Sequence, residues 1–263
     1  MTESHHYTRL LKAALGLVLD GARIAEANSG ARSLAQKESI RDIVTSADLA
    51  IDDLLTDGLL QTAIPIISEE REFNPSSLDA GKFWVIDPID GTVNFAHKIP
   101  FFAVSIGLVD EGEFILGAVC APDLDELYFT LSPSKALMNG QAFKHEHQAS
   151  QDSLVAASFT SRSVDAEYAL YKALNENTRG CLRTGSASLN ICWAAYGKLQ
   201  AAYGFRGKLW DVAGGLAIAR AAGCIIHTRR HAGTPFIDYV VGSKDTVAML
   251  MKEFTRLRLW EAA

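Results

Sequence analysis

Carboxylate side chains follow two short apolar runs of the sequence, and they are the residues best suited to chemistry. Residues 64–67 lead into Glu69 and Glu70, and residues 83–86 lead into Asp87. Apolar runs of this length are typical of buried strands. In α/β proteins the active site lies beyond the carboxyl ends of such strands. We therefore expect the two acidic turns to lie close together.

The spacing within the second turn suits a divalent cation. Asp87 and Asp90 flank Pro88, whose ring fixes one backbone angle and stiffens the turn. Gly91 permits a close approach of the backbone, and the N–H groups of Gly91 and Thr92 can bind an anion where a helix begins. Two rigid carboxylates suit Mg²⁺, and two such ions stabilise the attacking and leaving oxygens of a phosphoryl transfer. The turn therefore indicates metal-dependent phosphate chemistry.

Each acidic pair also has an ordinary explanation, on a solvated face or in a simple turn. Two clusters so close in sequence favour a shared cation, because uncompensated carboxylates repel one another. The net charge is −6 and no long basic run occurs, which argues against nucleic acid or a membrane as a partner. A mildly acidic protein that acts on phosphate therefore needs positive charge from a bound metal.

The rest of the sequence predicts helices and strands that can position these turns. An apolar stripe from Leu10 to Ala25 indicates a helix that ends near Asn28-Ser29-Gly30, and Thr45 and Ser46 suit the start of a second helix. Further helices are expected after Ser186, at residues 211–222 and from Lys244. Besides the two acid-tipped runs, strands are expected at residues 102–109, 115–120, 127–131, 154–159, 200–203, 224–227 and 239–241. This order indicates an α/β (α+β) protein with sheets layered between helices.

Several other features have plain structural interpretations. The polar residues 144–153 are the best boundary between two halves, 1–150 and 151–263, which act as one functional unit. Cysteines in or beside apolar stretches indicate reduced core thiols in a cytoplasmic protein, and no apolar run is long enough to span a bilayer. His145-Glu146-His147 is expected to be a solvated loop and Arg229-Arg230-His231 a charged turn. Tyr168 and Tyr171 are expected to pack against a neighbour. The cysteines are Cys120, Cys181, Cys192 and Cys224.

Several motifs, in one order, resemble the inositol monophosphatase family. Residues 84–95, which read Trp-Val-Ile-Asp-Pro-Ile-Asp-Gly-Thr-Val-Asn-Phe, resemble its signature. Residues 42–48 resemble its D-x-V-T-x-x-D motif, residues 67–70 its G-E-E motif and residues 210–215 its W-D-x-A-G motif. With Gly185-Ser186-Ala187, the resemblance covers most of the chain. It implies a layered αβαβα sandwich of the sugar-phosphatase type and a Mg²⁺-dependent phosphomonoesterase.

The resemblance also implies a set of metal ligands. Glu69, Asp87 and the carbonyl of Ile89 would bind a first Mg²⁺. Asp87, Asp90 and Asp211 would bind a second, and Glu69 would help to bind a third, hydrated ion. Mn²⁺ is an alternative metal. Without the other motifs, Asp211 would be interpreted as the N-cap of a helix.

The same resemblance implies catalytic and substrate-binding residues. Asp48 and Thr92 would orient and deprotonate the attacking water, and Glu69 is assigned with them to catalysis. The N–H groups of Gly91 and Thr92 would bind the phosphate. The further substrate-binding residues are Asp90, Ala187, Arg206 and Asp211.

The substrate is less well defined by the sequence. Inositol-specific members usually carry an acidic residue six positions before the tryptophan of W-D, where this chain has Gly204. Arg206 or Lys208 would instead favour a second negative group. Inositol phosphate is the default, and the alternatives are histidinol phosphate, fructose 1,6-bisphosphate and 3′-phosphoadenosine compounds, the last disfavoured by Val93-Asn94. The resemblance further implies a lithium-sensitive homodimer. A regulatory protein on the same scaffold is the rival from another class, disfavoured because every metal ligand is present.

Overall fold

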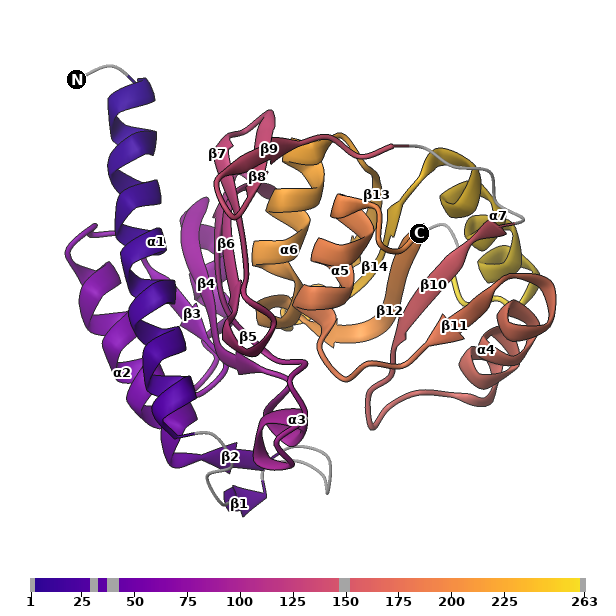
Figure 1. Ribbon diagram of the computed structural model, residues 1–263, viewed down its shortest axis with the longest axis horizontal. Helices are drawn as coiled ribbons and strands as arrows, with labels where there is room; N and C mark the ends of the chain where they lie inside the picture. Colours follow the sequence, from indigo (N-terminus) through magenta and orange to yellow (C-terminus); the bar gives the residue numbers. More distant parts are fainter. Residues whose placement is uncertain (1–2, 29–32, 37–42, 147–151, 261–263) are drawn as a thin grey trace.

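The computed structural model describes residues 3–28, 33–36, 43–146 and 152–260, and these form five alternating layers (Figure 1). Helices α1 (Glu3–Ala27) and α2 (Ser46–Leu60) cover the outer face of a seven-stranded sheet. Helices α5 (Ala187–Tyr196) and α6 (Leu209–Ala222) lie between this sheet and a five-stranded one. Helices α4 (Asp165–Asn177) and α7 (Lys244–Arg256) cover the far face of the second sheet. The expected αβαβα sandwich is confirmed.

The first sheet has the strand order β3-β4-β5-β6-β7-β8-β9. Its strands β3 and β4 are parallel, with Ser68 opposite Ile86, whereas the later neighbours are antiparallel. The two acid-bearing strands therefore end at the same edge, as the sequence predicts. The strands are β3 (Ile66–Ser68), β4 (Lys82–Asp90), β5 (Ala103–Asp110), β6 (Glu113–Ala121), β7 (Glu126–Ser132), β8 (Lys135–Met138) and β9 (Gln141–Phe143).

The second sheet has the strand order β11-β10-β12-β14-β13. Strand β10 pairs in parallel with β11 and β12, and β14 pairs antiparallel with β12 and β13. The strands are β10 (Leu154–Ser158), β11 (Gly180–Leu182), β12 (Ala201–Lys208), β13 (Ile225–Arg230) and β14 (Phe236–Gly242). The smaller elements are β1 (Ser33–Gln36), β2 (Ile43–Thr45), α3 (Thr92–Ala96) and the 3₁₀ turns η1 (Pro75–Ala80) and η2 (Pro122–Leu124).

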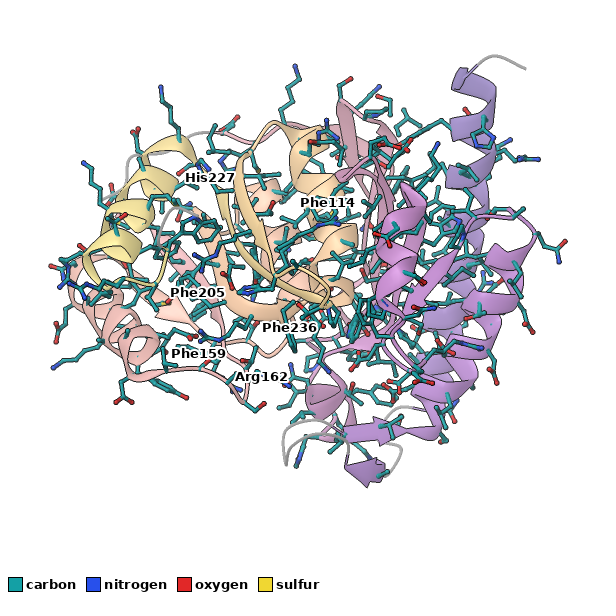
Figure 2. All side chains as sticks on the ribbon, turned by 180° about the vertical axis from the view of Figure 1, so that it is seen from behind. Phe114, Phe159, Arg162, Phe205, His227 and Phe236 are labelled. Atoms are coloured by element: carbon teal, nitrogen blue, oxygen red, sulfur yellow. The ribbon has the colours of Figure 1, made fainter. Side chains whose placement is uncertain are left out.

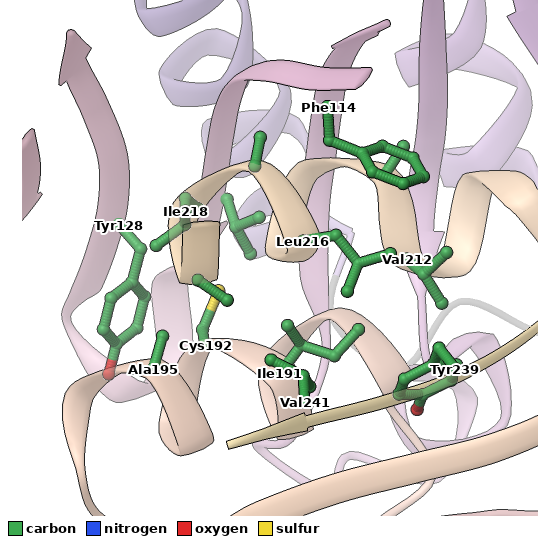
Figure 3. Close-up of a cluster of buried hydrophobic side chains, with 14 of the residues drawn as sticks. Phe114, Tyr128, Ile191, Cys192, Ala195, Val212, Leu216, Ile218, Tyr239 and Val241 are labelled. Atoms are coloured by element: carbon green, nitrogen blue, oxygen red, sulfur yellow. The ribbon is translucent and has the colours of Figure 1, made fainter. Parts of the chain in front are cut away.

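Side chains fill the space between the layers in three apolar clusters (Figure 2). The central cluster joins both sheets through α5 and α6. In it Val212 and Leu216 of α6 face Ile191 of α5 and Tyr239 of β14 (Figure 3). Helices that are apolar all round are typical of a buried layer, which explains why α5 and α6 have no polar face. The two halves of the chain thus share one core.

Helix α6 packs on the first sheet with its backbone against the strands. A Cβ on Gly117 of β6 would lie 2.1 Å from the carbonyl oxygen of Gly214, and a Cβ on Gly107 of β5 would lie 2.7 Å from the carbonyl carbon of Ala213. Only glycine permits such an approach. The small residues of the Trp-Asp-Val-Ala-Gly-Gly motif therefore set how close the start of α6 comes to the first sheet.

Some local expectations are wrong for reasons visible in the packing. The expected charged turn is instead the end of β13, where Arg229 lies opposite the buried Asp238 of β14 and forms an ion pair with it at 2.6 Å. His145 is buried, and its Nδ1 lies 3.0 Å from the carbonyl oxygen of Ala194. The strand expected at residues 200–203 continues to Lys208, and α6 begins before Asp211.

Other expectations are confirmed or fall outside the described residues. Thr45 caps α2, and the ring of Phe159 stacks on Tyr168 and meets Tyr171 edge-on. The four cysteines are free thiols. None of the helices in the described part of the chain is both long and apolar enough to cross a membrane. Asp42, Ser29, Gly30, His147 and the proposed boundary at residue 150 lie outside the described residues, and that boundary stays a prediction.

The close packing of α6 predicts that stability is sensitive to substitution of Gly117 in β6. Gly117→Ala places a methyl group against the carbonyl of Gly214, and relieving that overlap costs about 1–3 kcal/mol. We expect the thermal unfolding midpoint to fall by roughly 3–10 °C. Gly16→Ala is the matched control, because Gly16 lies on the exposed face of α1, where an added Cβ would meet no other part of the protein within 4 Å, and it should leave the midpoint equal or higher. Equal midpoints for the two variants would contradict this account of the packing.

Candidate active site

A cavity of about 660 Å³ opens where the carboxyl edge of the first sheet faces the start of α6 and the second sheet. The structure brings nearly all the predicted site residues to its wall. Asp48 lies just behind the wall, in contact with Thr92. The predicted residues that line the cavity are Glu69, Asp87, Ile89, Asp90, Gly91, Thr92, Ala187, Arg206 and Asp211.

Three carboxylates meet at one end of the cavity. Glu69 follows β3, Asp87 lies in β4 and Asp211 lies in the first turn of α6, and one oxygen from each lies within 4.8 Å of the others. Burial raises the pKa of Asp87 well above its usual value, and the charges of Glu69, Asp90 and Asp211 raise it further. Burial likewise raises the pKa of Asp211, helped by Glu69 and Asp90. The cluster is therefore electrostatically strained as long as only protein surrounds it.

Asp211 reaches this cluster from the third position of α6. Its Oδ2 accepts a hydrogen bond of 3.0 Å from the backbone N–H of Lys208, which is the N-cap residue. An N-cap role for Asp211 itself is therefore wrong. The backbone of α6 contacts β5 and β6 at Ala213 and Gly214. This contact holds the first turn of α6, and with it the Asp211 side chain, next to Asp87.

Asp90 has a different environment from its neighbours. Its carboxylate accepts hydrogen bonds from the Ser186 hydroxyl at 2.6 Å, from the N–H groups of Ala187 at 3.2 Å and Ser188 at 2.7 Å, and from the Ser188 hydroxyl. Burial still raises the pKa of Asp90, and the bonds from Ser186 and Ser188 oppose this rise. Asp90 thus joins the end of β4 to the start of α5, across the two halves. Ser186 belongs to a motif of the sequence, but no role was predicted for it or for Ser188.

Asp48 and Thr92 form a second polar group beside the acidic cluster. The Oδ2 atom of Asp48 accepts a bond of 2.8 Å from the backbone N–H of Thr45 and one of 2.5 Å from its hydroxyl. The remaining Oδ1 atom accepts from the Thr92 hydroxyl at 3.2 Å, and that hydroxyl also lies 3.0 Å from the carbonyl oxygen of Ile89. Burial raises the pKa of Asp48. The capping box of α2 therefore fixes the direction in which Asp48 presents Oδ1 to Thr92.

The turn that carries Glu69 is fastened to α2. Ser68, which replaces the usual glycine of the G-E-E motif, donates a hydrogen bond to Asp52, and its hydroxyl oxygen accepts from the N–H of Glu70 at 3.2 Å. Arg71 donates to the same Asp52 carboxylate at 2.7 Å. Ser68 and Asp52 are both buried. The serine therefore adds a tether that a glycine cannot supply.

The loop before α5 is fastened to α3 by one amide. The Nδ2 atom of the buried Asn94 donates to the carbonyl oxygens of Phe101 at 2.7 Å and Thr184 at 2.9 Å. Gly185 packs directly on this amide, and the backbone φ of Gly185 is +97°. Gly91, where α3 begins, has a φ of +98°. Both glycines are therefore required by left-handed backbone as well as by close contact.

The wall beneath Gly204 is filled by an aromatic ring. A Cβ at this position would lie 2.8 Å from the ring of Tyr239 and 3.1 Å from Cβ of Ser158. The two hydroxyls of Tyr239 and Ser158 hydrogen-bond to each other at 2.8 Å. Both residues line the cavity and neither was expected from the sequence. Local sequence carries no signal for them, because they come from two different strands.

Arg206 occupies a bulge of β12 next to this wall. Its backbone is left-handed, with a φ of +49°, and its N–H donates to the buried Asp238 at 2.7 Å. Its guanidinium is ion-paired with Glu167, which is 1% exposed. The expected substrate-binding arginine therefore lines the cavity with a carboxylate already beside it.

The acidic end of the cavity fits a divalent metal. Among the described residues, Oδ1 of Asp87 is a buried oxygen without a hydrogen-bond partner, and Asp87 belongs to the three-carboxylate cluster. Hard oxygen donors of this kind are the ligands that Mg²⁺ and Mn²⁺ prefer. A cation there would remove the repulsion that raises the pKa values.

Comparison with known proteins agrees with the fold and the motifs. The inositol monophosphatase family matches residues 5–255. A fructose-1,6-bisphosphatase/inositol-1-monophosphatase of Thermotoga maritima is 32% identical over 197 residues, 74% of each chain. Inositol monophosphatase 1 of Solanum lycopersicum is 32% identical over 235 residues, 82% of this chain and 84% of the relative. The structure of an IMPase of Thermotoga maritima has a TM-score of 0.83 at 25% identity and covers 95% of this chain and 98% of its own.

The resemblance drawn from the ordered motifs is thereby confirmed. A match that begins in α1 and ends in α7 includes every element that lines the cavity. The chain belongs to the inositol monophosphatase family of phosphatases.

Proposed function

We propose that this protein is a Mg²⁺-dependent phosphomonoesterase that hydrolyses a small phosphorylated metabolite. The observation that supports this most is the buried cluster of Glu69, Asp87 and Asp211 beside the Asp48–Thr92 pair. A purely structural metal site has no need of a positioned base next to it. The family's inositol 1-phosphate is the default substrate, and histidinol phosphate, fructose 1,6-bisphosphate and 3′-phosphoadenosine 5′-phosphate are the alternatives.

Two or three metal ions would lie at the acidic end of the cavity. Glu69, Asp87 and the carbonyl of Ile89 would bind the first, and Asp87, Asp90 and Asp211 the second, with Glu69 contributing to a third. Bound there, the metals would acidify a water molecule and neutralise the phosphate oxygens. The serines and N–H groups around Asp90 orient its carboxylate for this role and favour its ionised form, because they donate hydrogen bonds to its oxygens.

The chain's own groups would supply the remaining steps. The oxygen of Asp48 that faces Thr92 would take the proton of the attacking water through the Thr92 hydroxyl, and Thr45 keeps this carboxylate in place. The N–H groups of Gly91 and Thr92, where α3 begins, would bind the phosphate. Ala187, Arg206 and Asp211 line the space left for the rest of the substrate.

The remaining expectations come from the family, from the cysteines and from the polar residues 144–153. Assembly as a homodimer, inhibition by lithium and a cytoplasmic location stay predictions, as does the division at residue 150. A regulatory role on the same scaffold is the rival proposal. It is weaker because the carboxylate cluster, the Asp48–Thr92 pair and the cavity are all present together.

Phosphate release from a substrate panel tests the proposal. The panel holds inositol 1-phosphate, histidinol phosphate, fructose 1,6-bisphosphate and 3′-phosphoadenosine 5′-phosphate, each measured with Mg²⁺ and with a chelator. We expect release that depends on Mg²⁺ from at least one compound. Release that a chelator leaves unchanged would contradict the metal mechanism, and no release from any member would favour the regulatory rival.

Asp87→Asn separates the metal role from a structural one. The amide is isosteric and uncharged, so turnover should be lost while repulsion within the cluster falls. Without metal at pH 8, the unfolding midpoint should rise by about 2–4 °C, which is about 1 kcal/mol for a chain of this size. The rise in midpoint that Mg²⁺ gives to the parent protein should disappear.

Asp57→Asn, on the exposed side of α2, is the matched control for this variant. It should keep both the turnover and the stabilisation by Mg²⁺. A folded Asp87→Asn protein with normal turnover would end the site assignment.

Thr92→Val tests the proposed base. The variant keeps the size of the side chain but removes the hydroxyl between Asp48 and the cavity, so kcat should fall roughly 10²-fold or more. Thr92→Ser restores a hydroxyl and should recover most of the rate. The exposed Thr255→Val on α7 controls for the substitution itself. Equal rates in the valine and serine variants would show that the hydroxyl takes no part in catalysis.

A further inference from the structure

A second cavity opens on the side of the second sheet that α4 and α7 cover (Figure 1). Its volume is about 310 Å³, and residues at the start of α4 and directly after α7 form two of its walls. Of the described residues, Arg206 alone lines both this cavity and the active-site cavity. The carboxylates expected to bind metal do not line it, so the second cavity is chemically distinct from the first.

Three arginines from separate elements line the second cavity. Arg206 lies in the bulge of β12, Arg229 lies in β13 and Arg258 follows α7. No carboxylate belongs to the described residues of the lining. Like charges gathered in this way repel one another unless anions offset them.

Buried carboxylates offset two of the three charges. Arg206 is ion-paired with Glu167 and Arg229 with Asp238, and each of these carboxylates is 1% exposed. Arg258 is exposed and forms no ion pair with a carboxylate of the described residues. The lining therefore keeps one positive charge in excess, and that charge faces solvent.

Two of these arginines have an uncommon backbone conformation. The φ angle is +49° at Arg206 and +53° at Arg258. Arg258 lies just after the C-cap of α7, where glycine is the usual left-handed residue. A large side chain in this conformation costs stability, and such residues are concentrated at ligand sites.

The rest of the lining is apolar. Val164 is the N-cap residue of α4, makes no side-chain cap and is 44% exposed, although Ser, Thr, Asp and Asn are preferred there. Ala166 lies in the first turn of the same helix, so the positive end of its dipole is close to the arginines. Asp165, between them, is exposed and does not line the cavity. Leu257 and Leu259 complete an apolar surface beside the positive charge.

We propose that the second cavity is a ligand site for a small organic anion, in which a phosphate or a carboxylate is attached to an apolar group. The anionic group contacts Arg258 and Arg206, whose planar guanidinium donors match both kinds of oxyanion. The apolar group packs on Val164 and Leu257. Binding at this site requires neither metal nor hydrolysis, so it can be tested independently of the proposed function.

Titration calorimetry with the full-length protein tests the site. The probes are phenylphosphonate, methylphosphonate and benzoate, none of which is a phosphate ester. A chelator is present throughout, so that the carboxylates of the active-site cavity lack metal and repel anions. We expect saturable binding of phenylphosphonate or benzoate with a Kd of about 1 mM or below. Absence of saturable binding by all three probes would overturn the inference.

The ranking of the probes identifies the chemistry of the ligand. The tighter of phenylphosphonate and benzoate shows whether the site prefers a phosphate-like group or a carboxylate. Phenylphosphonate should bind at least about fivefold more tightly than methylphosphonate, because the ring is removed from water on the apolar surface. Equal binding of the two phosphonates would contradict the apolar contact.

Arginine variants place the binding in this cavity. Arg258→Gln should weaken binding of the best probe at least about fivefold. Arg256→Gln is the matched control, because this exposed arginine of α7 pairs with Glu253 and does not line the cavity. Arg183→Gln reports on the active-site cavity, which Arg183 lines. Both of these variants should keep the parent Kd. Unchanged binding in Arg258→Gln, or a loss in Arg183→Gln as large as in Arg258→Gln, would overturn the inference.

Val164→Ser tests the apolar wall without weakening the helix. Serine is a preferred N-cap residue, so α4 should remain folded while the apolar contact is lost. The preference for phenylphosphonate over methylphosphonate should fall toward one, and binding of methylphosphonate should change little. A preference that equals the parent value would contradict the contact with Val164.

Discussion

Mutual repulsion among buried carboxylates is the constraint on which the rest of this structure depends. Glu69, Asp87 and Asp211 come from three different elements, and nothing in their own chemistry keeps them together without a cation. Rigid packing must do so. The backbone contact of Gly214 with Gly117, the donors around Asp90 and the Ser68–Asp52 tether each fix one part of the acidic wall. The scaffold is thus preorganised for a ligand that balances the charge.

The two halves of the chain supply opposite parts of the cavity. The first sheet contributes the acidic end of the cavity, and the second sheet contributes the wall that includes Ser158, Arg206 and Tyr239. Helices α5 and α6 join them, since α5 begins at the residues that bind Asp90 and Asp211 lies in the first turn of α6. A ligand between the halves would therefore meet carboxylates on one side and the wall of the second sheet on the other.

The sequence could predict the acidic wall because its residues occur in short motifs with local spacing. Asp87, Asp90 and Gly91 lie in one turn, so the types and order of these residues are enough to indicate a metal site. Residues whose roles depend on how two strands pair could not be found in this way. Tyr239 beside Gly204 and the Arg229–Asp238 pair are examples. Arg229 was expected in a charged turn, but it lies in β13 opposite Asp238. The sequence analysis also lacks the short strands β8, β9 and β11 and the helix α4.

The contact between Gly204 and Tyr239 also restricts how this cavity can change during evolution. A side chain at position 204 would overlap the tyrosine ring, so a single substitution there damages packing before it can contribute to binding. A smaller residue at position 239 must come first, and that change alone opens a void in the core. The effects of substitutions at positions 204 and 239 are therefore epistatic. A lineage with Gly204 and Tyr239 can acquire an acidic residue at position 204 only through a less stable intermediate.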